Sequence, residues 1–514
     1  MAGASHVIGV DIGTTAVKSV LCEAGGRVIA EASRPGELIS ARPGWAEQDP
    51  EQWWLATVDT IRELMDSGRV AAQDIAAIGV SGMVPALVVL DSAGRPLRPS
   101  IQQNDARTAA QIRWFKDVVR EDEFFRVTGG SVNQQSIPPK LRWLADSEPR
   151  VYAAARWFVG SYDYVNYRLT GNLSLERNWA LESGFLDLTT GGWHQPYMDA
   201  VGVTPDQFPP VREPTAIVGE VTPAVAALTG LKCGTPVVAG CADHVASAFA
   251  AGLTGAGDLN IKFGGAGDVL FCLNRPDTDP RLFIDYHLIP GKFLLNGCMA
   301  ASGSAVRWFA RGFAAGSLEQ GRATGQAGAN IYEQLDAAAA DLAPGPDSLV
   351  VLPYFIGEKT PIHDPLARGV FFGLSLHHTP AHVHRAIMEA VAFGFRHHLD
   401  VLAERGHLPV KVVATDGGAR SKLWRQISAD VLGVPVLYRA RHPGSALGAA
   451  FVAGMAVGVF EEWAEIERFS EVTDVTQPDA ARSAAYSELY GIYREIYVAL
   501  KPSLERLARV GAPR

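Results

Sequence analysis

The sequence has few cysteines and lacks the common short motifs for phosphate binding and nucleophilic catalysis. Five cysteines are scattered among 514 residues without a CxxC pair, which argues against a disulfide scaffold or a cysteine-based zinc site. The patterns GxxxxGK[ST] and GxGxxG are absent, so neither a P-loop nor a Rossmann dinucleotide site is expected. No GxSxG segment is present either, which argues against the nucleophile elbow of an α/β-hydrolase.

An excess of basic residues and a long hydrophobic run are also missing. Lysine and arginine total 46 against 55 acidic residues, a net charge of −9, so nucleic acid is not an expected partner. The longest apolar run, Leu447 to Phe460, is about four residues short of a membrane span and is rich in Gly and Ala. We therefore expect a packed core helix there, no membrane partner, and a cytoplasmic protein without a signal peptide.

Glycine is abundant, with 52 residues, and many short apolar runs end at glycine turns. "HVIGVDIGTT" and "VKSVLCE" read as two strands of an antiparallel meander, and helical spacing follows from Gln52 to Met65. Near the midpoint, "NIKFGGAGDVLFCL" repeats the pattern of "GVDIGTTAVKSVLC", with Lys262 opposite Asp11. This pattern indicates an α/β protein with an internal duplication, unless two glycine hairpins coincide by chance.

Three glycine turns follow apolar strands and are candidates for holding phosphate groups. They are Gly13-Thr14-Thr15, Gly264-Gly265-Ala266 and Gly417-Gly418-Ala419. Successive backbone N–H groups in such turns can cradle phosphate oxygens. Most glycine turns are only turns, but three of them, two related by the apparent repeat, favour a nucleotide site.

Two aspartates stand where strands end. Asp11 could hold Mg²⁺ against phosphates or could simply cap a turn. Asp243, in "VVAGCADHVASAFAAG", could be a general base at a strand-to-helix corner or an N-cap residue. Seven of the thirteen histidines lie between His363 and His398, without a metal-binding spacing, and we expect these to be ordinary surface or core side chains.

Taken in order, the motifs resemble the FGGY family of carbohydrate kinases over almost the whole chain. "IGVDIGTTAVK" looks like the family's first phosphate motif, and "VVAGCADHVASA" like the segment with its catalytic Asp. "PGWAEQDPEQWW" and "NDARTAAQ" are similar to segments of its xylulokinases. "LPYFIGEKTPIHDPLARGVFFGLS" resembles the second family signature, and "GGARSKLWRQISADVLGVPV" and "GSALGAAFVAG" resemble the adenosine-binding region.

The resemblance implies an α/β fold with two actin-like domains, as in hexokinase and the Hsp70 ATPase, around a nucleotide cleft. The expected domains are residues 1–252, with the sugar site, and 253–514, with the adenosine site. The implied reaction uses ATP and Mg²⁺ to phosphorylate a sugar or polyol, with Asp243 as base and Asp11 holding the metal. The residues implied in binding nucleotide are Gly13, Thr14, Thr15, Lys18, Gly264, Gly265, Gly417, Gly418 and Ala419, and those facing the sugar are Met83, Val84, Asn104, Asp105, Asp243 and His244.

Several positions depart from the xylulokinase pattern. Met83-Val84-Pro85 replaces Gln-Met-His, His244 replaces an Asn or Gln, and Gly265-Ala266 replaces Thr-Ser. The leading hypothesis is therefore a ketopentose kinase most like xylulokinase. The alternatives are a kinase for ribulose, an L-ketose, a tetrulose or a polyol, or a non-catalytic actin-like nucleotide-binding module. The resemblance also allows a homodimer.

Overall fold

The first strands of the chain build the sheet on which the predicted phosphate turn stands. A computed structural model describes residues 5–314, 330–440 and 444–510. Strand β1 (His6–Ile12) pairs antiparallel with β2 (Ala16–Glu23), which pairs with β3 (Arg27–Pro35), so the predicted meander is confirmed. On its other side β1 runs parallel to β5 (Ile75–Gly82). Because β1 and β5 are almost wholly buried, their sequences are near-continuous apolar runs.

The chain divides into two compact units that are not continuous in sequence. The first unit contains residues 1–254, 274–294 and 441–470, and the second contains 255–273, 295–440 and 471–514. The domain boundary expected between residues 252 and 253 lies close to residues 254 and 255, where the chain first passes from the first unit to the second. Residues 274–294 and 441–470 also belong to the first unit, so a single boundary does not describe the two units. That division of the functional domains stays a prediction.

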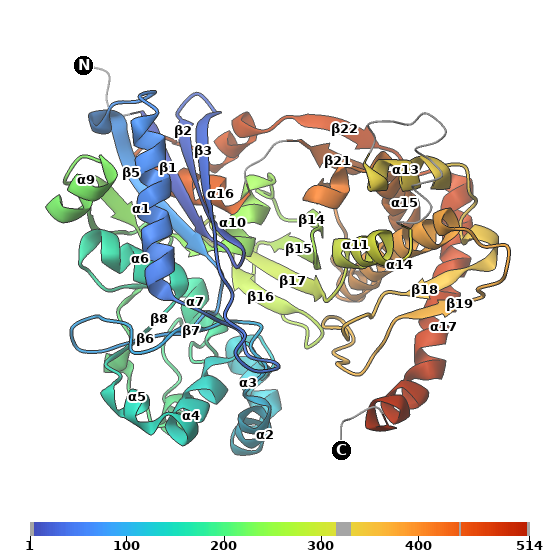
Figure 1. The fold of residues 1–514 in the computed structure, drawn as a ribbon, viewed down its shortest axis with the longest axis horizontal. Helices are drawn as coiled ribbons and strands as arrows, with labels where there is room; N and C mark the ends of the chain where they lie inside the picture. The colour runs from blue at the N-terminus through green and yellow to red at the C-terminus, as the bar shows by residue number, and fades with distance from the viewer. Residues whose placement is uncertain (1–4, 315–329, 441–443, 511–514) are drawn as a thin grey trace. The chain divides into compact units, whose positions relative to one another are not determined.

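The first unit holds a sheet in the order β11-β12-β5-β1-β2-β3, with β13 also pairing with β5 (Figure 1). Its later strands are β11 (Ile217–Glu220), β12 (Pro236–Val238) and β13 (Cys241–Ala242). Short strand pairs are β4 (Glu47–Gln48) with β7 (Ser100–Ile101), β6 (Val88–Leu90) with β8 (Trp157–Val159), and β9 (Leu175–Glu176) with β10 (Val211–Arg212).

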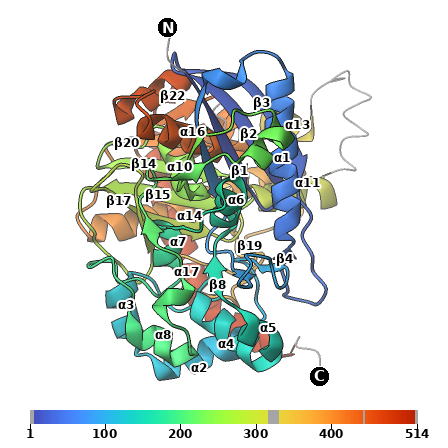
Figure 2. The ribbon, with the colours of Figure 1, turned by 90° about the vertical axis from the view of Figure 1, so that its left-hand side faces the viewer.

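Helices cover the two faces of this sheet. Helix α1 (Pro50–Asp66) packs on β2 and β3, and α6 (Ser161–Thr170) packs on β5; both lie on the near side in Figure 2. Helix α10 (Asp243–Ala250) packs against α16 (Ser445–Ala456), which packs on β1 and β5. The other helices of the unit are α2 (Ala109–Val118), α3 (Glu121–Thr128), α4 (Ile137–Ser147), α5 (Pro149–Ala154), α7 (Arg177–Glu182), α8 (Gln195–Val201) and α9 (Pro223–Thr229).

Small residues allow α16, which comes late in the sequence, to pack closely on the sheet of the first unit. A Cβ on Gly9 of β1 would lie 1.9 Å from the Ala446 carbonyl oxygen, and one on Gly79 of β5 would lie 2.1 Å from that of Ala449. Only glycine strands facing an alanine- and glycine-rich helix permit such close packing. The predicted core helix is confirmed, whereas "GSALGAAFVAG", assigned by resemblance to the adenosine-binding region, lies on the sheet that carries Asp11.

The second unit repeats the same module of strands. Strand β14 (Asp258–Phe263) pairs antiparallel with β15 (Gly267–Leu273) and parallel with β20 (Lys411–Thr415). The sheet contains the order β17-β15-β14-β20-β21-β22, with β17 (Phe293–Met299), β21 (Val436–Arg439) and β22 (Val472–Thr476). The repeat suspected from the sequence is therefore present as a shared arrangement of strands.

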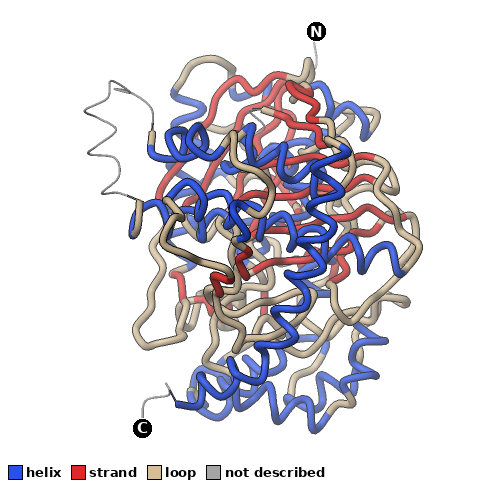
Figure 3. Tube along the Cα trace, turned by 90° about the vertical axis from the view of Figure 1, so that its right-hand side faces the viewer, coloured by secondary structure: helices blue, strands red, loops and turns tan. Residues whose placement is uncertain are grey.

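Long helices pack around this second sheet, and Figure 3 shows helices in front of its strands. They are α11 (Gly303–Gly312), α13 (Ile331–Ala339), α14 (Pro380–Glu404), α15 (Lys422–Leu432) and α17 (Ala480–Val510), beside the short pair β18 (Val350–Leu352) and β19 (Val370–Phe372). Apolar residues at every fourth position from Val383 to Leu399 predict α14, and Leu423, Ile427 and Val431 predict α15; both helices are confirmed. The Ala-, Gly- and Gln-rich segment from Ala314 to Asp347 predicts a further helix, which is confirmed at α13. Residues 315–329 lie outside the described residues. Among the described residues, no helix combines the length and apolarity needed to cross a bilayer.

Candidate active site

Three strand ends bring the predicted aspartates of the first unit to one edge of the sheet. Asp11 of β1 is in register with Ser81 of β5, and Ser81 is in register with Cys241 of β13. Asp243 follows directly, as the first residue of α10. Because β1, β5 and β13 are parallel, their carboxyl ends meet at this edge, which is where ligands bind in open α/β sheets.

The turn after β1 is tight and is fixed by hydrogen bonds. The Ser81 hydroxyl donates to Asp11 Oδ1 at 2.9 Å. The Gly13 N–H donates to the Ala16 carbonyl at 3.0 Å and closes the hairpin. This N–H is therefore already used and does not point to a ligand. Thr15 is exposed and Thr14 is half-buried, and both hydroxyls belong to the turn. Lys18, exposed on β2, is in register with Asp11.

Asp243 begins α10 but does not cap it, because the N-cap residue is Ala242. Its Oδ1 accepts the backbone N–H of His244 at 2.6 Å. The side chain is 32% exposed, so the carboxylate is fixed and still open to a ligand. The alternative of an N-cap residue is therefore wrong, and the role of general base stays a prediction.

His244 lies among three carboxylates that come from three different elements. Its Nε2 is 3.0 Å from Asp285 Oδ2, on β16 (Phe283–Tyr286), and 3.9 Å from Glu182 Oε1, at the end of α7. Its Nδ1 is 3.5 Å from Asp243 Oδ1. We call Asp243, His244, Glu182 and Asp285 the acidic cluster. Sequence reasoning missed Glu182 and Asp285, which stand in no recognisable motif.

Burial and charge oppose one another at His244. Burial alone lowers the pKa of an imidazole, but the carboxylates of Asp285, Asp243 and Glu182 outweigh it and raise the pKa of His244 well above its usual value. Burial, with the neighbouring charge of Asp285, raises the pKa of Glu182 well above its usual range. These pKa directions favour the charged form of the imidazole and the neutral form of Glu182.

The segment after β5 lies beside this edge. Met83 donates its N–H to the Ile12 carbonyl at 3.1 Å, and its Sδ is 3.8 Å from the Thr14 hydroxyl. Met83 and Val84 are buried, and a cis peptide bond joins Val84 to Pro85. Behind it, the buried Lys140 donates to the Pro85 carbonyl at 3.3 Å. Met83 and Val84, two of the residues predicted to face the sugar, therefore form an apolar wall next to the phosphate turn.

Asn104 and Asp105 have different surroundings although they are adjacent. Asn104 is exposed, whereas Asp105 is fully buried. Asp105 Oδ2 accepts the Ala46 N–H at 2.6 Å and the Arg107 guanidinium at 2.7 Å. That guanidinium lies 3.7 Å from the ring centroid of Trp45. The observed contacts of Asp105 thus position Arg107 and the chain at Ala46.

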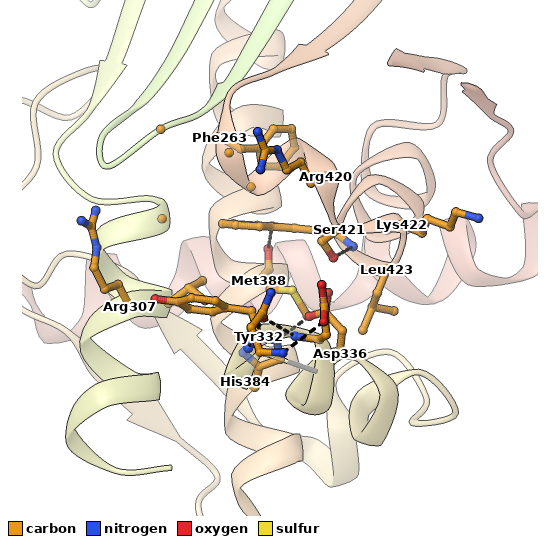
Figure 4. Close-up of a pocket in the computed structure, with 18 of the residues that line it drawn as sticks. Phe263, Arg307, Tyr332, Asp336, His384, Met388, Arg420, Ser421, Lys422 and Leu423 are labelled. Carbon is orange, nitrogen blue, oxygen red and sulfur yellow. Dashed lines mark hydrogen bonds and ion pairs between the residues drawn. The ribbon is translucent and has the colours of Figure 1, made fainter. Parts of the chain in front are cut away.

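In the second unit, a cavity of about 770 Å³ opens beside the other two glycine turns. Gly264 and Gly265 lie on its wall, as do Gly417 and Gly418. Figure 4 shows Tyr332 extending toward Arg307, and the hydrogen bond between His384 Nε2 and Asp336 Oδ1, which are 2.7 Å apart. The other lining residues are Phe263, Gly303, Val306, Asn330, Glu333, Ala337, Met388, Arg420, Ser421, Lys422, Leu423 and Trp424.

Glycine is required at particular points of this wall. A Cβ on Gly418 would lie 2.6 Å from the Trp424 ring and 2.8 Å from Phe263 Cβ, whereas one on Gly417 would meet nothing within 4 Å. Ala419 is fully buried and does not line the cavity; its carbonyl accepts a hydrogen bond from Arg425. The sequence located the glycines, but Tyr332, Asp336 and His384 carry no motif that singles them out.

Comparison with known proteins identifies the class of enzyme. A model of the FGGY family of carbohydrate kinases, N-terminal domain, matches residues 6–250, and a model of the C-terminal domain matches residues 272–457. The chain therefore belongs to the FGGY family of carbohydrate kinases. It is an ATP-dependent enzyme that phosphorylates a sugar, and its fold is the two-domain kinase fold of that family.

Individual members of the family show which sugar kinases the chain resembles. Xylulose kinase of Bacillus subtilis (strain 168) is 32% identical over 500 residues, which cover 96% of this chain and 97% of that protein. The crystal structure of xylulose kinase from Rhodospirillum rubrum matches with a TM-score of 0.89 and 44% identity, covering 97% of this chain and 100% of that one. Gluconate kinase from Lactobacillus acidophilus also matches, with a TM-score of 0.89 and 27% identity, covering 98% and 99%. The chain is thus xylulose kinase-like.

Proposed function

We propose that this sugar kinase phosphorylates a ketopentose such as D-xylulose, with Asp243 as the general base. The observation that carries the proposal is the Asp243 carboxylate, which is fixed by the His244 N–H yet 32% exposed at the carboxyl ends of β1, β5 and β13. The 44% identity to a xylulose kinase supports the acceptor class.

In the proposed reaction, the sugar hydroxyl oxygen attacks the γ-phosphorus of ATP as the bond to the β–γ bridging oxygen breaks. Asp243 accepts the hydroxyl proton, and ADP leaves with the electron pair of the broken bond. Such transfers depend chiefly on positioning and on neutralising phosphate charge. The apolar wall at Met83 and Val84 excludes water, which would otherwise compete with the sugar as acceptor.

Mg²⁺ suits the oxygen ligands at the end of β1. Asp11 offers a half-buried carboxylate held by Ser81, and Mg²⁺ is commonly bound through one or two carboxylates together with substrate phosphates. When it is bound with ATP, it neutralises charge on the β- and γ-phosphates. Thr14, Thr15 and Lys18 are proposed to contact the phosphates in the same region.

The nucleotide is proposed to bind at the cavity of the second unit. Gly264 and Gly265 would approach its phosphates, and Gly417 and Gly418 its adenosine, because these positions leave the wall without side chains. Ala419 is proposed to support that wall through Arg425. Asn104 is placed among the sugar contacts, and Asp105 acts on that region by holding Arg107.

The acidic cluster favours a neutral acceptor over a sugar acid. Two unit charges of the same sign 4 Å apart repel by about 1–4 kcal/mol, depending on the local dielectric. A substrate carboxylate next to Asp243 and Asp285 would meet this repulsion. We therefore place the chain with the ketose kinases rather than with gluconate kinases, although it resembles both.

A coupled ADP-release assay with MgATP tests the proposal. D-xylulose is compared at equal concentration with D-ribulose, L-xylulose, erythrulose, xylitol and D-gluconate. We expect a neutral ketose to be preferred at least tenfold over gluconate, and the activity to be lost in Asp243→Asn. Preference for gluconate would contradict the acceptor class, and an active Asp243→Asn enzyme would contradict the assignment of the base.

A further inference from the structure

The imidazole of His244 is held at both of its nitrogens. Nε2 faces Asp285 Oδ2 at 3.0 Å, and Nδ1 faces Asp243 Oδ1 at 3.5 Å. Glu182 Oε1 lies 3.9 Å from the same Nε2. The side chain is only 16% exposed. An imidazole that faces an acceptor at both nitrogens is best matched when both nitrogens carry protons.

The charged groups that face this ring come from three elements. They are Asp243 on α10 itself, Glu182 on α7 and Asp285 on β16. The neighbouring strand β13 contributes only Cys241 and Ala242, and α16 presents an alanine- and glycine-rich surface. The short helix η5 (Trp463–Phe469) meets α10 at its far end, where Trp463 packs on Phe249 with ring centroids 5.4 Å apart.

The positive charge of the His244 ring therefore affects Asp243, the proposed base. Negative charges this close repel one another, and burial with the charge of Asp285 already favours the neutral form of Glu182 by raising its pKa. A cation among them offsets that repulsion. The base in a phosphoryl transfer must be ionised before it can accept the hydroxyl proton, so the cation bears directly on the fraction of active enzyme.

We propose that His244, held in place by Asp285 and Glu182, is the countercharge that offsets the negative charge of Asp243 and orients its carboxylate. His244 and Asp285 are then positioning residues for the reaction, acting through Asp243. The inference rests on the proposed function, in which Asp243 is the base. It assigns a task to two residues, Glu182 and Asp285, that no sequence motif marks.

Two substitutions with opposite expected effects test the inference. In His244→Asn the carboxylates lose their cation, and the acid limb of the kcat/KM profile for the sugar moves to higher pH by about one unit or more. In Asp285→Asn the imidazole remains and one negative charge is removed, so the acid limb moves to lower pH. MgATP is kept saturating throughout, so the profile reports groups of the enzyme before the sugar binds.

The double variant His244→Asn/Asp285→Asn removes one charge of each sign. We expect its acid limb to lie between those of the two single variants and its activity to exceed that of His244→Asn alone. His377→Asn, at a 60% exposed histidine of the second unit, is the matched control and leaves the profile unchanged. Thermal melting of each variant confirms that it is folded.

A purely structural role predicts a different pattern. Both single variants would then lose activity without a change in the midpoint, and the double variant would be the worst. Unshifted profiles, or shifts in the same direction, would overturn the inference. Failure of the proposed function is recognised separately, because Asp243→Asn would then keep its activity whatever happens at His244.

Discussion

The two glycine hairpins share a backbone arrangement but place their acidic and basic residues in exchanged positions. In the first unit β1 pairs with β2 and with the parallel strand β5, and in the second β14 pairs with β15 and with the parallel strand β20. Asp11 stands at the end of β1 opposite Lys18, whereas Lys262 stands at the corresponding place in β14 and pairs with Asp268 at 3.3 Å. One copy thus presents a carboxylate where the other presents an amine.

The surroundings of the two hairpins also differ. Beside the first lies the acidic cluster with Asp243. Beside the second, glycines line a cavity together with the cationic side chains Arg307, Arg420 and Lys422 and the acidic side chains Glu333 and Asp336. The repeated strands thus place a possible ligand site at the same point of each unit, and the residues at the strand ends determine the chemistry of each site.

The largest expected difference between the hairpins lies at Asp11 and Lys262. Asp11→Asn removes the carboxylate proposed to hold Mg²⁺, and because such a metal contributes several kcal/mol of charge stabilisation, kcat falls about 10²-fold or more. Lys262→Gln removes an ion pair with Asp268, an interaction that contributes about 0–1 kcal/mol at partly exposed sites, and we expect kcat to stay within a few-fold. Steady-state kinetics at saturating MgATP and sugar measures both variants. Equal losses would contradict the division of roles.

A smaller effect is expected at the glycine wall of the cavity. Gly418→Ala places a methyl group 2.6 Å from the Trp424 ring, so the wall must shift. Overpacking of this kind costs about 1–3 kcal/mol, and we expect ATP to bind about tenfold more weakly. Gly491→Ala, on α17 and away from the cavity wall, is the matched control, because its added methyl group meets nothing within 4 Å. If Gly418→Ala and the control bind ATP with equal affinity in a titration, the cavity is not the nucleotide site.

The smallest effect compares the buried cations of the two units. In the second unit the buried Arg385 donates to Glu389 at 2.9 Å. In the first, Lys140 donates to the Pro85 carbonyl, and burial lowers its pKa from 10.5 to about 7. Between pH 7 and 10.5 the unfolded chain therefore binds more protons at this position than the folded protein, so the stability contributed at Lys140 rises with pH.

Lys140→Met removes this dependence. Between pH 7 and 8 we expect the wild-type free energy of unfolding to rise by about 1 kcal/mol relative to the variant. Denaturant titrations at the two pH values measure the difference, and the unfolding transition of the first unit is the one to follow. Parallel behaviour of the two proteins would show that Lys140 does not titrate in this range.

Sequence reasoning found the parts of this molecule that repeat or alternate. Apolar runs ending at glycines located β1, β14 and β20 and the turns that follow them, because strand burial and turn chemistry are local properties. Asp11 and Asp243 were found for the same reason, since each stands at the end of a strand. The family resemblance then assigned their proposed roles.

The remainder depends on contacts between distant segments. Glu182 and Asp285 approach His244 from α7 and β16, and nothing in their own neighbourhoods predicts it. Asp105 belongs to a motif similar to one in xylulokinases, yet its carboxylate is buried against Ala46 and Arg107. The return of α16 to the first sheet requires Gly9 and Gly79 to face its alanines, which only the folded chain reveals.

The most direct test of this account measures phosphoryl transfer and nucleotide binding in Asp243→Asn. Transfer is followed as ADP release with the best acceptor, and binding as a titration with MgATP. We predict that the affinity for MgATP stays within about threefold of wild type, while kcat falls about 10²–10⁴-fold, the usual contribution of a general base. An Asp243→Asn enzyme with nearly wild-type kcat would contradict the central claim that the carboxylate at the first unit's sheet edge carries out the proton transfer.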